Sequence, residues 1–167
     1  MVTVLSLGGS IVAPDSPDPE FLRSFAQLAR TWLADLFEVW QAAGLLSDGA
    51  AVDDQLEKAR LLLTELVANA VRHGDRSFTV RLHLAAGRLR VEVADNSDRM
   101  PVLRCPESAA TEGRGLRLVD ALAGDWGVQL EEHGKVVWFE LALRGDADEE
   151  VVTHERLLAA FAEPDGL

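Results

Sequence analysis

Glu65 and Asn69 are polar residues in a largely apolar run of the chain, Leu61 to Gly74. Because residues at i and i+4 share one helix face, a carboxylate and an amide would stand one turn apart. Their oxygens suit Mg²⁺, and a carboxylate close to a phosphate can activate an attacking hydroxyl. The pair therefore indicates a site for phosphate chemistry, and the simpler alternative is a solvated polar edge of an amphipathic helix.

A second candidate is Asp95, which follows the alternating segment Val91 to Ala94 and precedes Asn96 and Ser97. At the end of a strand, its carboxylate could accept a hydrogen bond from the amino group of a ligand. It could equally close an Asx turn with the two residues after it. The residue alone leaves both interpretations open.

The third group is glycine-rich and opens a helical stretch. Glycines there allow backbone N–H groups to meet a phosphate at a helix N-terminus, although a lone G-x-G is commonly only a turn. The four residues concerned are Gly113, Arg114, Gly115 and Leu116.

Hydrophobic periodicity predicts the elements that position these groups. Apolar residues recur at helical spacing from Pro19 to Gly44, which predicts a first helix of about 25 residues. Its Phe37 and Trp40 belong either to the core or to a partner surface. A second helix is predicted from about Asp54 to His73, and a short one over 116–123. Alternation predicts strands over 78–84, 89–93, 126–131 and 135–143, and a strand or hairpin near the start of the chain.

This order of elements predicts an α+β fold. Strands joined by tight turns pair antiparallel, so we expect a two-layer sandwich with a mixed, mostly antiparallel sheet and helices on one face. The expected division is an N-terminal strand or hairpin extension over 1–17, one domain over 18–144, and an acidic amphipathic helix over 145–167. The loop from Met100 to Glu112 shows no clear period.

Composition narrows the function classes. The chain has 167 residues, a net charge of −12 and one cysteine, Cys105. The acidic balance disfavours direct binding to nucleic acid or to an anionic membrane. A lone thiol excludes an internal disulfide, and no apolar run approaches a membrane span, so we expect a cytoplasmic protein.

In their order along the chain, the three groups resemble the N, G1 and G2 boxes of the GHKL (Bergerat-fold) ATPases. The resemblance covers about 18–143 and is closest to the serine-kinase anti-sigma factors and their actinobacterial relatives, which share the segments Leu116 to Ala123, Trp126 to Val128 and Gly134 to Phe139. It implies ATP and Mg²⁺ as ligands and residues 100–112 as a lid. It also implies Asn69 as the metal ligand, Glu65 as the base, Asp95 as the acceptor for adenine, and a phosphate-binding group of Gly113, Arg114, Gly115 and Leu116.

The chain departs from the family pattern in two places. Ser97 and Arg99 occupy the two glycine positions after Asp95, and Val136 stands where a nucleotide-proximal Thr is often seen. Two functions therefore compete. One is a serine/threonine protein kinase that phosphorylates a small anti-anti-sigma protein and holds a sigma factor inactive. The other is a non-catalytic partner-binding module with weak or lost ATP binding. The terminal extensions either dock on the body or mediate homodimerisation.

Overall fold

The computed structural model describes residues 7–13, 19–73, 77–97, 99–100 and 114–143. Within these ranges the chain forms five strands and three helices. In chain order they are β1 (Leu7–Ala13), α1 (Pro19–Ala42), α2 (Ala50–His73), β2 (Phe78–Ala85), β3 (Arg88–Asp95), α3 (Arg114–Leu122), β4 (Asp125–Glu131) and β5 (Gly134–Ala142).

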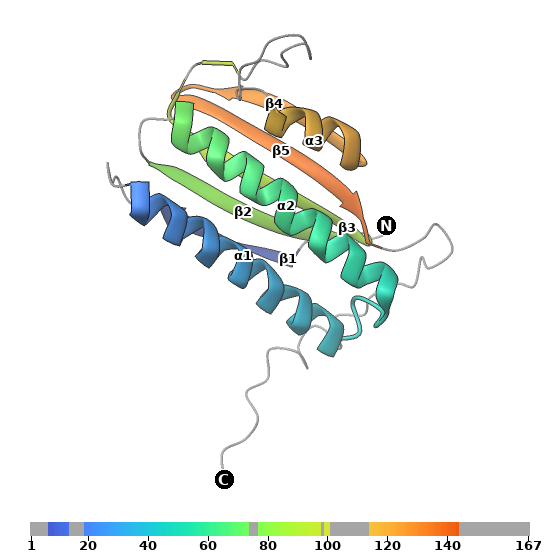
Figure 1. Cartoon of the computed structure of the whole chain (residues 1–167). Helices are drawn as coiled ribbons and strands as arrows, with labels where there is room; N and C mark the ends of the chain where they lie inside the picture. The colour runs from blue at the N-terminus through green and yellow to red at the C-terminus, as the bar shows by residue number, and fades with distance from the viewer. Residues whose placement is uncertain (1–6, 14–18, 74–76, 98, 101–113, 144–167) are drawn as a thin grey trace.

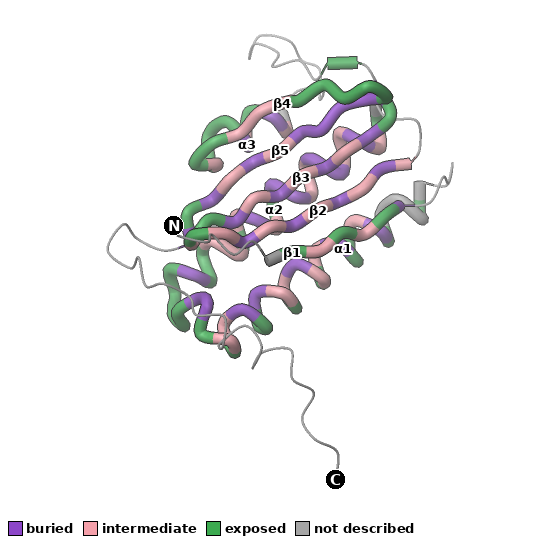
Figure 2. The backbone as a smooth tube through the Cα atoms, turned by 180° about the vertical axis from the view of Figure 1, so that it is seen from behind, coloured by how far each residue is buried: buried purple, intermediate pink, exposed green. Residues whose placement is uncertain are grey.

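The strands form one sheet in the order β1-β2-β3-β5-β4, and the four pairings between neighbours are antiparallel. All three described helices lie on one face of this sheet (Figure 1). The opposite face, seen in Figure 2, has no described helix over it. The predicted α+β two-layer sandwich with helices on one face is thus confirmed.

The core lies between the helices and the sheet. Phe37 and Trp40 of α1 are 1% and 2% exposed, and their rings pack 5.6 Å apart. They are therefore core residues rather than a partner surface. Phe25 of α1 meets Phe78 of β2 edge to face, with ring centroids 5.0 Å apart. These contacts fix α1 against the first half of the sheet.

Two helices begin earlier than their periodicity predicted. α2 begins at Ala50 rather than near Asp54, because Val52 is buried and extends the apolar face by a turn, and its N–H bonds to the carbonyl of Gly49. α3 begins at Arg114 rather than at 116. The predicted helix over 145–167 lies outside the described residues, as does nearly all of the predicted lid.

In this topology the end of α2, the start of β2, the end of β3 and the start of β5 lie at the same end of the sandwich. α2 ends shortly before β2 begins, and Phe78 of β2 pairs with Asp95, the last residue of β3. Asp95 in turn pairs with Lys135 near the start of β5. The C-terminal half of α2, which carries Glu65 and Asn69, therefore lies toward the same end of the sandwich as Asp95.

Candidate functional site

The helices place Glu65 directly against Gly115. Glu65 is half-buried on α2, and a Cβ added to Gly115 in the first turn of α3 would lie 2.5 Å from its Oε2 and 3.3 Å from its Cβ. That is closer than real side chains approach one another, so only glycine fits without a shift of Glu65. The structure thus joins the predicted base to one residue of the predicted phosphate-binding group.

Asn69 lies one turn beyond Glu65 on the same helix and is also half-buried. An amide oxygen and a carboxylate on one face are hard oxygen donors, which is the chemistry that Mg²⁺ requires. Mg²⁺ commonly takes only one or two protein ligands and completes its shell with phosphate and water. The donor set at this end of α2 therefore fits a Mg²⁺–phosphate group, for which Asn69 would be the protein ligand, with Glu65 beside it.

The remainder of the predicted phosphate-binding group is described only in part. Gly113 lies outside the described residues, and Arg114 begins α3 with a side chain that is not described. Leu116 is 5% exposed and packs in the core, so it anchors α3 rather than offering a side chain to a ligand. Its contribution to a phosphate site would come from its backbone.

Asp95 is buried and already engaged. Its Oδ1 accepts a hydrogen bond from the backbone N–H of Ser97 at 2.9 Å, which closes the Asx turn that the sequence left as one of two possibilities. The same oxygen accepts a second hydrogen bond from Lys135 Nζ at 2.8 Å. The acceptor predicted for a ligand's amino group is therefore bound to an ammonium group of the chain itself.

Lys135 forms a buried ion pair with Asp95. The two side chains are 0% and 1% exposed, and Lys135 Nζ also donates to the carbonyl of Ser97 at 3.1 Å. A buried charge is tolerated only when it is paired and hydrogen-bonded, and both conditions are met here. The pair therefore fixes the end of β3 to the start of β5.

Gly134 allows this close approach. Its φ of +119° lies in a region that side chains rarely adopt, and an added Cβ would collide with the carbonyl oxygen of Asp95. The hairpin between β4 and β5 can thus bring Lys135 opposite Asp95 only with glycine at this position.

Of the two residues that replace glycine after Asp95, Ser97 stabilises the turn. Ser97 is 7% exposed, and its Oγ accepts a hydrogen bond from the backbone N–H of Arg99. Ser97 therefore contributes its N–H, its carbonyl and its hydroxyl to the turn. The side chain of Arg99 is exposed.

Sequence reasoning missed Lys135, although a signal was present. In β5 the residues alternate between the two faces, and Lys135 shares its face with Val137, Phe139 and Leu141, which are buried against the helices. A lysine on the buried face of such a strand indicates a buried carboxylate partner, because a buried ammonium group needs an opposite charge. Val136, which departs from the family pattern, pairs with Ala94 and lies on the other face of the strand.

The site thus has two unlike ends. At the α2–α3 end, oxygen donors and a glycine without a side chain leave a setting that suits a metal and phosphate. At the β3–β5 end, the Oδ1 atom of Asp95 is occupied by Lys135 and the Asx turn. The described residues therefore fit the phosphate part of a nucleotide better than they fit recognition of a base amino group by Oδ1.

Among the described residues, no group of three or more His, Cys, Asp or Glu side chains is arranged to hold a metal by itself.

Comparison with known proteins identifies the family. The model of the histidine kinase-like ATPase domain family matches residues 19–141. That range is most of the chain and contains nearly every element of the sandwich, so the chain belongs to this family of nucleotide-binding domains.

Among solved structures, the chain resembles the histidine kinase domain of the blue-light activated histidine kinase from Erythrobacter litoralis EL346. The two are 21% identical, with a TM-score of 0.43, over 74% of this chain and 60% of that chain. This chain thus spans less than two thirds of that domain. No curated protein matches the chain. In the part of the chain that the structure describes, no helix is long and apolar enough to cross a membrane.

Proposed function

We propose that this chain is an ATP-binding regulatory protein of the anti-sigma factor, serine/threonine kinase type. It would phosphorylate a small anti-anti-sigma partner and sequester a sigma factor, and its place would be the cytoplasm. The observation that carries the proposal is the position of Glu65 against Gly115, with Asn69 one turn away. That arrangement brings together a carboxylate, an amide that would ligate the metal, and a helix N-terminus.

In this proposal each residue acts on a bound Mg²⁺–ATP. Asn69 would ligate the metal, and the backbone of Gly113, Arg114, Gly115 and Leu116 would meet the phosphates at the start of α3. Glu65 would orient the partner's hydroxyl and accept its proton. Mg²⁺ supplies neutralisation of the phosphate charge when bound.

The first test is calorimetric titration of the full chain with ATP, with and without Mg²⁺, for the wild type and Asn69→Ala. We expect binding that Mg²⁺ strengthens in the wild type, and loss of that strengthening in the variant. Gln41→Ala, which removes an amide from α1 at the far end of the sandwich, is the matched control. Absence of binding by the wild type at millimolar ATP would overturn the proposal.

Phosphotransfer is tested separately, with candidate partners taken from neighbouring genes that encode small anti-anti-sigma or sigma proteins. Glu65→Gln should retain ATP binding and lose transfer to the partner, because the amide cannot accept the proton. Undiminished transfer by Glu65→Gln would remove Glu65 from the role of base.

The second candidate is a non-catalytic partner-binding module, and the Lys135–Asp95 ion pair favours it. A carboxylate that is 1% exposed and bound to a lysine would have to exchange that partner in order to accept an adenine amino group. The two candidates give different titrations: the module predicts weak or no ATP binding together with retained binding to a protein partner.

A further inference from the structure

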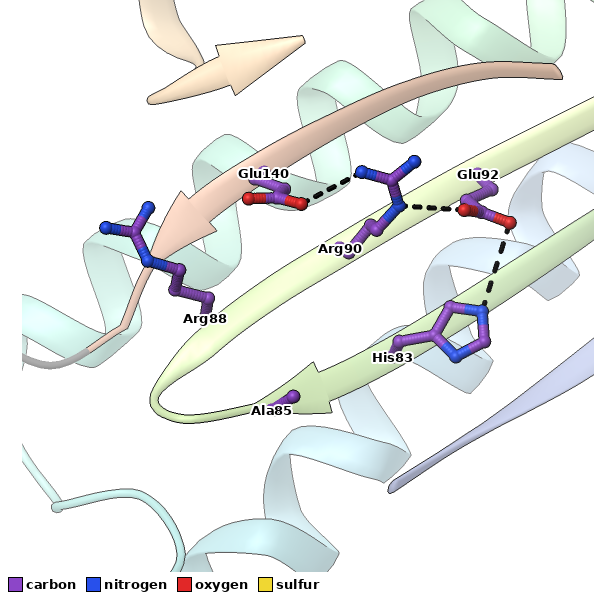
Figure 3. Close-up of a pocket in the computed structure, with 6 residues that line it drawn as sticks. All are labelled: His83, Ala85, Arg88, Arg90, Glu92 and Glu140. Carbon is purple, nitrogen blue, oxygen red and sulfur yellow. Dashed lines mark hydrogen bonds and ion pairs between the residues drawn. The ribbon is translucent and has the colours of Figure 1, made fainter. Parts of the chain in front are cut away.

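The helix-free face of the sheet carries a hollow of about 370 Å³, which lies at the end of β3 opposite to Asp95. It lies on β2, β3 and β5 near the turn between β2 and β3 (Figure 3). The residues that line it are His83, Ala85, Arg88, Arg90, Glu92 and Glu140.

Arg90 satisfies both acidic residues of the hollow. Its Nε donates to Glu92 at 2.7 Å and its Nη1 donates to Glu140 at 2.9 Å, as Figure 3 shows. Burial alone would lower the pKa of Arg90, but these hydrogen bonds and the two negative charges outweigh it and raise the pKa. The guanidinium also stacks on Trp138, 3.9 Å from the ring centre. Arg90 therefore stays charged and locks the two carboxylates.

The other basic side chains of this face outnumber the carboxylates that remain to pair with them. Arg81 and His83 lie 3.6 and 3.9 Å from Glu92, which already binds Arg90 more closely. Arg88 is exposed and has no salt bridge among the described residues. Three guanidinium groups, of Arg81, Arg88 and Arg90, thus stand against two carboxylates at this corner, which gives it a net positive charge in a chain of net charge −12.

The chain leaves the sheet at this corner. Ala142 pairs with Arg88, and the backbone N–H of Leu143 bonds to the carbonyl of Gly87 at 2.8 Å. Residues 144–167 therefore begin beside the hollow. They begin with Arg144 and Gly145, and their acidic run follows, with Asp146, Asp148, Glu149 and Glu150. At full extension these lie within about 10 to 25 Å of Leu143, so the nearest can reach Arg88.

We propose that residues 144–167 bind back on the helix-free face, with their acidic run at the basic corner of Arg81, His83 and Arg88. Beyond that run, Val151, Leu158 and Phe161 recur at helical spacing. An apolar stripe of this kind would cover the half-buried side chains of Trp138 and Ala94. The tail, rather than a second copy or a foreign protein, is the occupant because it is tethered next to the site and has the opposite charge.

The test is paramagnetic relaxation in the full chain. A spin label at Ala159→Cys, in a Cys105→Ser background, lies far enough from Leu143 for an unbound tail to visit both faces. We expect amide signals of β2 and β3 around Arg81 and Arg88 to lose roughly half of their intensity or more. Signals from the outward side of α1 should stay near full intensity. Equal weak effects on the two sides would overturn the proposal.

Charge reversal and salt identify the contact. Arg88→Glu should restore most of the lost intensity, whereas Arg117→Glu, the same change at an exposed position of α3, should not. Because the attraction is between exposed charges, about 0.5 M salt should act like Arg88→Glu, which gives a second readout without a substitution. An effect that survives both changes would contradict the charge-based contact.

A mixture of two samples tests whether the tail binds a second copy of the chain instead. One sample carries the spin label without ¹⁵N, and the other carries ¹⁵N without the spin label. Intensity loss in that mixture would show that the tail binds a second copy and would overturn the intramolecular proposal. Full intensity there, with loss in the singly labelled sample, supports it. The result does not depend on ATP binding, so it is separate from the fate of the proposed function.

Discussion

The two ends of the sheet use the same ion-pair chemistry in different surroundings. At one end Lys135 and Asp95 pair at 2.8 Å with side chains 0% and 1% exposed. At the other, Arg90 binds Glu92 and Glu140 at 2.7 and 2.9 Å, with side chains 17% to 29% exposed. The distances are nearly equal, so distance does not distinguish the pairs. Burial does, because it determines what remains when one partner is removed.

The difference has a direct energetic consequence. Removing one partner of a fully buried pair leaves an uncompensated charge away from water, whereas a partly exposed charge regains its hydration. The Lys135–Asp95 pair should therefore be sensitive to each single substitution, and the open-face network should be tolerant. Substitutions at the two ends test this contrast, beginning with the largest expected effect.

Lys135→Met should lower the free energy of unfolding by about 3–5 kcal/mol, because Asp95 is left buried without its cation. Urea denaturation of the full chain measures it. Lys58→Met is the matched control: Lys58 pairs with Asp54 at 2.9 Å, but the side chains are 35% and 66% exposed. We expect the control to cost less than about 1 kcal/mol.

Adding Asp95→Asn to Lys135→Met should recover part of the loss, since the stranded charge is removed. Equal losses for Lys135→Met and Lys58→Met would show that burial does not separate the two kinds of pair, and the comparison would fail.

Gly134→Ala should cost about 3 kcal/mol, because a Cβ at φ +119° is strained and meets the carbonyl of Asp95. The loss would come from the backbone that holds Lys135 opposite Asp95. Gly124→Ala is the control, since its Cβ would only touch the carbonyl of Glu140 at 3.4 Å. Denaturation midpoints that are equal for the two variants would contradict this account.

The sequence predicted the parts of this structure that depend on local pattern. Alternation located the paired strands of 78–84 and 89–93, and helical spacing located α1, because burial of one face imposes each period. The family resemblance implied that Glu65 and Gly115 belong to one nucleotide site, and the structure places Glu65 beside Gly115.

The Lys135–Asp95 pair depends on something that local pattern does not contain. It requires the register between β3 and β5, which are separated along the chain by α3 and β4. A slip of one residue would have set Val136 opposite Asp95 and turned Lys135 to the open face. The start of α2 at Ala50 was missed for a related reason, since Val52 is buried by tertiary packing rather than by its near neighbours.

Arg90→Lys should cost about 1 kcal/mol, because an ammonium group cannot reproduce the two-carboxylate bridge and the stacking on Trp138 together. The effect tests whether the open-face network depends on its central residue. Arg60→Lys on α2, whose pair with Glu57 is exposed, is the control and should cost less. If Arg90→Lys lowered the free energy of unfolding as much as Lys135→Met does, the Arg90 network would behave like a fully buried ion pair, which would contradict the comparison.

Glu140→Gln should have the smallest effect, about 0.5 kcal/mol, because Arg90 keeps Glu92 and the introduced amide still offers a hydrogen-bond acceptor. The informative measurement is its salt dependence. In about 1 M salt the difference between wild type and Glu140→Gln should shrink, since partly exposed charges are screened. The loss caused by Lys135→Met should persist in the same salt, because ions do not reach a side chain that is fully covered. A salt-sensitive loss for Lys135→Met would mean that water and ions reach this pair, and that the end of the sheet opens readily enough to expose Asp95.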